Sequence, residues 1–200
     1  MPPGAGTLCD VDVLPARLPE DLERLVLAYH VWRSSEHPPP CMVHHLVLDA
    51  PMDTVCPWLR TLATDSGFDH PLPPSLPAAL MRLVIGDDFD HPLPVVLPAS
   101  LQILMIGDDF HHPLPAMLPD SLRILALGDD FDHPLPESLP ASLHTLALGW
   151  HFNQALPEAL PASLVHLTLG HNFDRSLPDP LPDTLEALTL GSNFSYPLPT

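Results

Sequence analysis

The sequence contains no lysine, and its basic residues are seven arginines set against 25 aspartates and glutamates. The formal net charge is −18, of which residues 68–200 carry −13, from sixteen acids and three arginines. Phosphate backbones are bound through lysine and arginine. The composition therefore disfavours nucleic acid and anionic membranes as partners, and it leaves basic proteins and cations open.

Long hydrophobic runs are also missing. No apolar stretch approaches the roughly 18–20 residues that span a bilayer, so no membrane insertion is expected. The first residues lack a basic segment followed by an apolar one, so no secretory signal is expected either. Only three cysteines are present, Cys9, Cys41 and Cys56. An odd number without zinc-like spacing favours reduced thiols in an intracellular protein, with the cytoplasm as the expected compartment.

Catalytic motifs are absent as well. The sequence has no nucleophile elbow, phosphate loop or His-Glu metalloprotease motif. Serine recurs in phase just before each expected strand, which is most simply a turn position. These serines are Ser100, Ser121, Ser142 and Ser163. Because catalytic groups need one converging pocket and nothing marks one, we expect neither an enzyme nor a bound cofactor.

What the sequence does contain is leucine and 29 prolines in a strict 21-residue period. Phenylalanine and glycine each recur at this interval. The phenylalanines are Phe68, Phe89, Phe110, Phe131, Phe152, Phe173 and Phe194, and the glycines are Gly86, Gly107, Gly128, Gly149, Gly170 and Gly191. Residues 68–193 form six full repeats, residues 194–200 a partial seventh, and residues 1–67 an N-terminal cap with degenerate repeats.

Each repeat predicts one coil of a solenoid. Leu125 and Leu127 alternate as the inward residues of a short strand, Gly128 follows at an expected sharp turn, and Phe131 is expected to fill the corner. Proline then stiffens an extended return arm. A single coil cannot offset its own ordering entropy, so neighbours must stack. The predicted fold is a leucine-rich-repeat-like β-solenoid with one short parallel strand per coil, proline-rich return arms and little helix.

The repeats resemble FNIP repeats, relatives of leucine-rich repeats. Their pattern appears here as Leu97-Pro98-Ala99-Ser100-Leu101, then Leu104, Ile106-Gly107, Phe110 and Pro113-Leu114. Phe152-Asn153 matches the name-giving dipeptide, whereas Phe89-Asp90 and most other repeats carry aspartate. The resemblance covers about two-thirds of the chain. It implies a curved parallel β-solenoid used for protein interaction, sometimes joined to an F-box, and it brings no catalytic residues.

The two ends depart from the repeat. Residues 18–27 fit the strand half of a degenerate coil, as do Leu46-Val47-Leu48, and Asp65 stands where the turn glycine is expected. An alternative for residues 18–32 is a helical F-box remnant, which would make the protein a substrate-recognition subunit of a ubiquitin ligase. Thr200 falls in the middle of a coil, so the strand near residues 185–190 is expected to need a following segment or a cover.

The outward strand positions are expected to line a concave face that binds a protein or peptide. Two rows of these positions are small or apolar, and an acidic ledge follows the glycines. Trp150 interrupts this ledge, and with His166 and His171 it is expected to form one patch suited to an interaction hot spot. The candidate binding residues are Arg82, Ile103, Met105, Ile124, Thr145, Trp150, His166 and His171.

The acids and histidines leave a cation-dependent structural solenoid open as a further alternative. Stacked carboxylates can share a calcium ion, although no calcium-loop pattern is present and turn aspartates more often bond backbone groups. The weak metal candidates are Asp87, Asp88, Asp108, Asp109, Asp129 and Asp130, beside the histidines His70, His91, His112 and His133. We expect no specific metal site.

Overall fold

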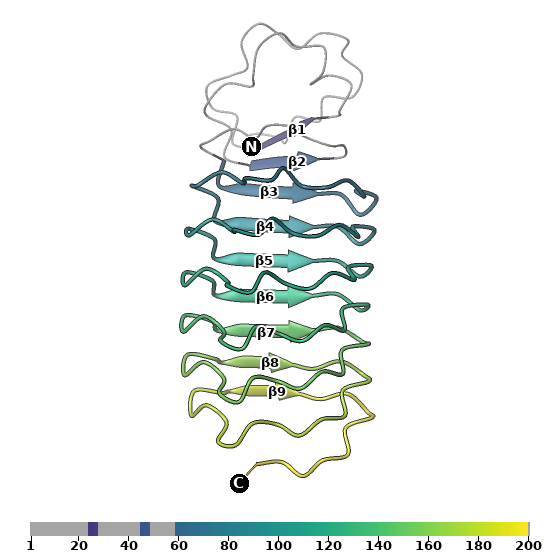
Figure 1. Ribbon diagram of the computed structural model, residues 1–200, viewed down its shortest axis with the longest axis vertical. Helices are drawn as coiled ribbons and strands as arrows, with labels where there is room; N and C mark the ends of the chain where they lie inside the picture. Colours follow the sequence, from purple (N-terminus) through teal and green to yellow (C-terminus); the bar gives the residue numbers. More distant parts are fainter. Residues whose placement is uncertain (1–23, 28–44, 49–58, 200) are drawn as a thin grey trace, which may run out of the picture.

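The described part of the protein is a stack of coils whose strands form one parallel sheet (Figure 1). The computed structural model describes residues 24–27, 45–48 and 59–199. The strands are β1 (Arg24–Leu27), β2 (His45–Leu48), β3 (Thr61–Thr64), β4 (Arg82–Ile85), β5 (Ile103–Ile106), β6 (Ile124–Leu127), β7 (Thr145–Leu148), β8 (His166–Thr168) and β9 (Ala187–Thr189). They pair in chain order. The described residues contain no helix, and hence none that could cross a membrane.

The register of the sheet places equivalent residues of successive repeats side by side. From β3 onward each strand residue pairs with the residue 21 positions later, as Leu104 does with Leu125. Between β2 and β3 the offset is shorter, because His45 pairs with Thr61. Equivalent side chains therefore form rows along the solenoid, which confirms the predicted coil.

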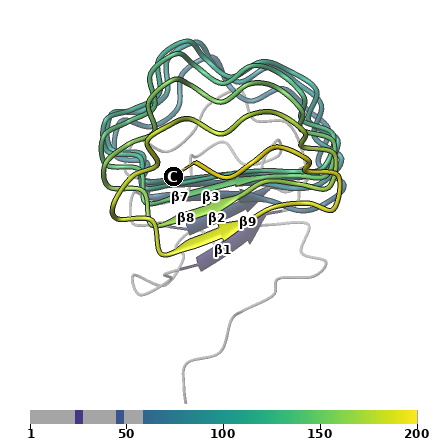
Figure 2. The ribbon, with the colours of Figure 1, turned by 90° about the horizontal axis from the view of Figure 1, so that it is seen from below.

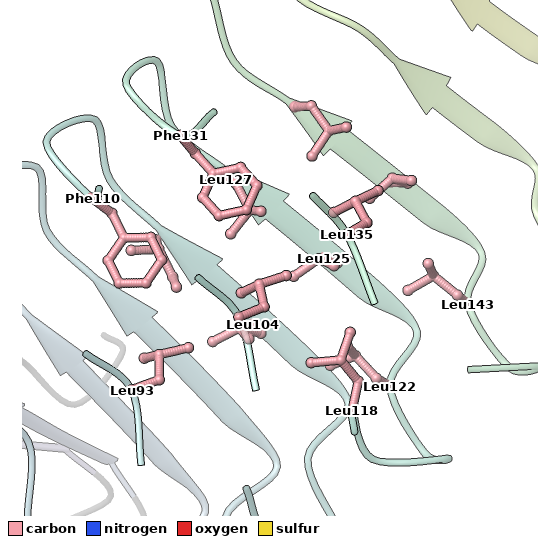
Figure 3. Close-up of a cluster of buried hydrophobic side chains, with 14 of the residues drawn as sticks. Leu93, Leu104, Phe110, Leu118, Leu122, Leu125, Leu127, Phe131, Leu135 and Leu143 are labelled. Carbon is pink, nitrogen blue, oxygen red and sulfur yellow. The ribbon is translucent and has the colours of Figure 1, made fainter. Parts of the chain in front are cut away.

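The core of the solenoid is a ladder of leucines closed at one corner by a stack of phenylalanines (Figure 3). Leu125 and Leu127 point inward and are buried, and Phe131 has no exposed surface. The Phe131 ring lies 6.1 Å from those of Phe110 and Phe152, nearly parallel to both. The predicted inward leucines and corner phenylalanine are thus confirmed.

The return arm completes each coil without needing ladder hydrogen bonds of its own. Leu135 and Leu139 of one arm are buried under the sheet, while proline keeps the intervening backbone extended. A turn then leads the arm into the next strand, because the amide of Leu143 donates to the carbonyl of Pro140 at 3.0 Å. This is the extended, proline-stiffened arm that the sequence predicts.

The recurring glycines serve a different purpose from the one predicted. No glycine in the described part of the chain has a positive φ, so the turn does not require glycine's conformational freedom. Instead, adjacent coils approach closely at this row. A Cβ on Gly128 would lie 2.3 Å from the carbonyl oxygen of Gly107 and 2.5 Å from the Cα of Asp108. Glycine is needed because any side chain would collide with the backbone of the preceding coil.

Where aspartate or asparagine follows the phenylalanine, its side-chain oxygen links the coil to the next one; His111, which follows Phe110, is the exception among the full repeats. Oδ1 of Asp132 accepts the amide of Asn153 at 2.8 Å, and Oδ1 of Asn153 accepts the amide of Asp174 at 3.0 Å. Asp69, Asp90 and Asp174 make the same bond to the following coil. Aspartate and asparagine both supply this oxygen, which explains why the two alternate in the motif.

We expect Asp132→Ala to destabilise the protein by about 1 kcal/mol, because the amide of Asn153 and Nε2 of Gln154 both lose their acceptor. Asp132→Asn should keep near wild-type stability, since Asn153 makes the equivalent bond in the next coil. Urea unfolding followed by circular dichroism compares the two variants. An equal loss in both would mean that the charge, and not the acceptor, stabilises the stack.

The in-phase serines form a second link between coils. They lie in turns, as predicted, but their hydroxyls reach across to the preceding coil. Oγ of Ser121 lies 2.8 Å from the carbonyl oxygen of Ala99 and 2.6 Å from that of Leu101. Ser100, Ser142, Ser163 and Thr184 repeat this arrangement. In the described residues these hydroxyls therefore donate to backbone carbonyl groups that lie outside the hydrogen-bonded strands.

The sheet is bowed along the solenoid axis. Figure 2 views the stack along this axis, with the strands on one side and the return arms on the other. The strands near the two ends, β1 and β9, lie farther from the return arms than β3 and β7 do. The outer face of the sheet is therefore the inside of the curve, which makes it the concave face.

The N-terminal strand β1 lies where the F-box alternative requires a helix. That alternative requires a helix across residues 18–32, but Arg24–Leu27 is a strand that pairs in parallel with β2. Arg24–Leu27 and His45–Leu48 are strands at the positions expected for degenerate coils, and a helix is excluded for Arg24–Leu27. The rest of residues 1–58, including all three cysteines, lies outside the described residues.

Candidate protein-binding face

The concave face is made of the side chains that alternate with the buried leucines. In β4, β5, β6 and β7 the first and third residues are exposed or half-buried, while the second and fourth are buried. Every predicted binding residue on a strand therefore points outward. These residues are Arg82, Ile103, Met105, Ile124, Thr145 and His166.

A hollow lies on this face across neighbouring coils, from Thr64 at the end of β3 to Gly128 after β6. It encloses about 500 Å³ over the ends of β4, β5 and β6. Val84, Met105 and Ala126 contribute its apolar surface, and Asp87 and Asp108 lie at its acidic side. Met105 is 40% exposed, because the residue paired with it on β6 is the small Ala126. The hollow thus combines an apolar surface with carboxylates at its edge.

Trp150 and His171 of the predicted patch are in direct contact, and His166 stands at the start of the neighbouring strand. The Trp150 and His171 rings stack with their centroids 4.2 Å apart, and Nδ1 of His171 lies 2.9 Å from Oγ of Ser192. His166 begins β8 and stands five residues before His171, which lies in the turn after that strand. The direct contact within the predicted three-residue patch is therefore the Trp150–His171 pair, and the inclusion of His166 stays a prediction.

The acidic ledge follows the glycines along the same edge of the sheet. Oδ1 of Asp108 accepts the amide of Asp129 at 3.2 Å, and Oδ1 of Asp129 accepts the amide of Trp150 at 3.0 Å. Strands lie about 4.8 Å apart, so neighbouring carboxylates repel one another. Among the described residues, Asp87, Asp108 and Asp129 have no ion-pair partner. The ion pairs in this part of the chain join histidines to other aspartates, namely Asp69, Asp90 and Asp130.

The metal candidates do not converge. Within the described ranges, no group of three or more histidine, cysteine, aspartate or glutamate side chains is placed to hold a metal ion. Histidines of this row lie instead within hydrogen-bond distance of backbone carbonyl oxygens in the preceding coil. Nε2 of His91 lies 3.2 Å from the carbonyl oxygen of Asp69, and Nε2 of His112 lies 3.1 Å from that of Asp90. These rings lie against the phenylalanine stack, as His91 does on Phe89.

A polar hollow near the C-terminal coils was not predicted. It encloses about 680 Å³ and is lined by Asp132, His151, Asn153, Asn172, Asp174 and Asn193. The side-chain Nδ2 of Asn172 lies 3.1 Å from Nδ1 of His151, and the side-chain Nδ2 of Asn193 donates to Oδ1 of Asn172 at 3.3 Å. The signal in the sequence is the change from aspartate to asparagine in the row before phenylalanine. Most of the polar groups in this hollow already bond one another between coils.

The geometry of the coil agrees with a comparison against known families. The FNIP Repeat family matches residues 68–109, 91–130, 110–151, 131–172 and 152–193, which together span residues 68–193. The chain belongs to the FNIP repeat family. The rows of phenylalanine, aspartate or asparagine, serine and glycine that define this FNIP protein are the residues that pack or bond one coil to the next.

Among solved structures, the FNIP protein is similar to CroV588, described as a novel circular LRR protein. The two are 31% identical with a TM-score of 0.67, and the match covers 84% of this chain and 27% of CroV588. This chain thus spans about a quarter of that protein. No curated protein matches the chain. FNIP and leucine-rich-repeat-like solenoids are non-enzymatic families with a fold typical of protein-interaction scaffolds.

Proposed function

We propose that this protein is an interaction scaffold whose concave face binds a protein segment lying along the solenoid axis. The observation that carries the proposal is the hollow over β4, β5 and β6, where Met105 stays exposed above the small Ala126 and the glycine row. Apolar surface of this kind, rimmed by polar groups, marks protein contact sites. Methionine is well suited to such a surface because its side chain adapts to different partners.

Rigidity supports the same surface. The side chains of the concave face stand on strands that are tied to both neighbours by backbone, aspartate and serine hydrogen bonds. A preorganised surface loses little conformational entropy when a partner binds. A segment crossing several coils can also contact one side chain per row in each coil, which gives a repeat protein an extended binding surface.

The return side offers a competing surface. Val95, Val96 and Met117 are 86%, 77% and 82% exposed on adjacent return arms. They lie on the convex side of the bowed stack, where neighbouring side chains diverge and a partner contacts fewer of them at once. The concave face is therefore the favoured site, and the return side provides a matched control.

Ala126→Arg should abolish partner binding, because a long charged side chain would fill the hollow beside Met105. Ala116→Arg places the same side chain on the return arm of the same coil, where Ala116 is exposed, and it should leave binding unchanged. The measurement is affinity purification from cell extract with wild type and both variants, followed by mass spectrometry. Melting temperatures of the three proteins control for folding.

The expected result is a set of proteins retained by wild type and Ala116→Arg and lost with Ala126→Arg. Proteins retained equally by Ala126→Arg would contradict binding at the hollow. Selective loss with Ala116→Arg would move the binding site to the return side near Met117.

A further inference from the structure

We propose that the segment bound on the concave face is basic, with lysine or arginine along one flank and an apolar side chain beside it. This inference rests on the proposed function and specifies the chemistry of its partner. It follows from the arrangement of charge around the hollow over β4, β5 and β6.

The hollow offers an apolar side chain and unpaired carboxylates to the same ligand. Asp87 and Asp108 line it together with Val84, Met105 and Ala126. Both aspartates are exposed, and neither forms an ion pair with any residue in the part of the chain that the structure describes. Asp108 uses one carboxylate oxygen to accept the amide of Asp129. Its other oxygen, and the carboxylate of Asp87, remain available to a cationic side chain of a partner.

The ledge continues past the hollow toward the C-terminal coils. Asp129 follows Asp87 and Asp108 in the next coil of the same row and is also exposed. Strand spacing places successive carboxylates about 4.8 Å apart. A segment that runs along the solenoid axis would therefore meet one carboxylate per coil. Cations spaced along one flank of such a segment would relieve the repulsion between these neighbours.

The basic residues on the strands that line the hollow, and His144 and His166 of the next two coils, lie away from Asp87, Asp108 and Asp129; His171 follows farther along the same row, beyond Trp150. Arg82 and His166 occupy the first position of their strands, and Arg123 and His144 directly precede β6 and β7. These residues stand at the beginnings of the strands, whereas the ledge follows the ends. The concave face is therefore polarised across its width, with carboxylates on one side, apolar rows in the middle and basic groups on the other. This polarity orients the partner so that its basic flank faces the ledge.

A bound metal ion is a weaker explanation for the same carboxylates. In the described residues no three metal-ligating side chains converge, and each coil presents the ledge as separate aspartates. A row of single carboxylates beside an apolar surface matches a row of side-chain cations on a polypeptide better than one compact ion. The partner is accordingly a protein segment that carries lysine or arginine.

The test uses a random library of 12-residue peptides displayed on phage and selected on the full chain. We expect the selected sequences to place lysine or arginine beside leucine, methionine or phenylalanine. A synthetic peptide of the consensus sequence is then measured against three proteins: wild type, Ala126→Arg, and the triple variant Asp87→Asn, Asp108→Asn and Asp129→Asn. Asparagine keeps the Oδ1 acceptors of the ledge and removes only its charge.

The triple variant should bind the consensus peptide roughly tenfold more weakly than wild type, as expected for three exposed ion pairs. The wild-type affinity should also fall between 50 mM and 500 mM salt, and this dependence should be smaller in the triple variant. Equal affinity of the triple variant, or selection of neutral or acidic peptides that Ala126→Arg still blocks, would overturn the basic-partner inference alone. Peptide binding that Ala126→Arg leaves unchanged would overturn the proposed site as well.

Discussion

Gly128→Ala is expected to lower the stability of the protein by about 3 kcal/mol or more, although it adds a single methyl group. The added Cβ would lie 2.3 Å from the carbonyl oxygen and 2.4 Å from the carbonyl carbon of Gly107, and 2.5 Å from the Cα of Asp108. These atoms are backbone, so no side chain can rotate away to make room. The coils carrying β5 and β6 would have to separate, which weakens their shared ladder and core.

The loss is measured as the urea midpoint and the melting temperature of wild type and variant. For a chain of this size a loss of 3 kcal/mol corresponds to a fall in melting temperature of about 6–12 °C. Gly67→Ala is the matched control, because the nearest atom to its added Cβ is Oδ2 of Asp88 at 4.0 Å. This control should be neutral or slightly stabilising. A Gly128 variant as stable as the Gly67 variant would contradict the close approach of the coils.

Phe131→Ala is expected to cost about 3–5 kcal/mol, the range typical of truncating a buried phenylalanine. Phe131 has no exposed surface, and its ring lies between Phe110 and Phe152 at 6.1 Å from each. Removing the ring leaves a cavity within the stack and breaks its continuity at the middle of the solenoid. Since each coil contacts only its neighbours, the break should also reduce the cooperativity of unfolding.

The matched control for Phe131→Ala is Met117→Ala, which truncates a large apolar side chain that is 82% exposed on the return side. Its expected effect is within about 0.5 kcal/mol. Urea unfolding monitored by circular dichroism gives both values, and a broader transition in Phe131→Ala would report the lost cooperativity. Similar midpoints for the two variants would show that the phenylalanine stack contributes little to stability.

Much of the fold was predictable because the same pattern of leucine, glycine and phenylalanine occurs in six successive full repeats. The alternation at Leu125 and Leu127 indicates a strand with one buried side, and the constant spacing of Phe110, Phe131 and Phe152 indicates a stack. Equal repeat lengths then require a parallel register. Each of these inferences concerns residues whose role is set within one coil or by the period itself.

The candidate site was only partly predictable. The outward rows were expected because inward and outward residues alternate along a strand, and the pairing of Met105 with Ala126 follows from the period. The sequence does not show how far His166 lies from Trp150, because His166 begins its strand whereas Trp150 follows the end of its own strand. The hollow beside Met105 was not predicted either, since its shape depends on the bow of the sheet and on the sizes of side chains in several coils.

By itself, the sequence determined the length of the coil, the buried leucine and phenylalanine rows and the acidic character of the ledge. The tertiary structure decided why glycine recurs, which oxygens link the coils, and where apolar and acidic surfaces meet. Those features arise between residues about 21 positions apart, such as Gly107 and Gly128 or Asp132 and Asn153. Contacts between coils depend on the distance and the angle at which the coils stack. The pattern of residues within one repeat determines neither the distance nor the angle.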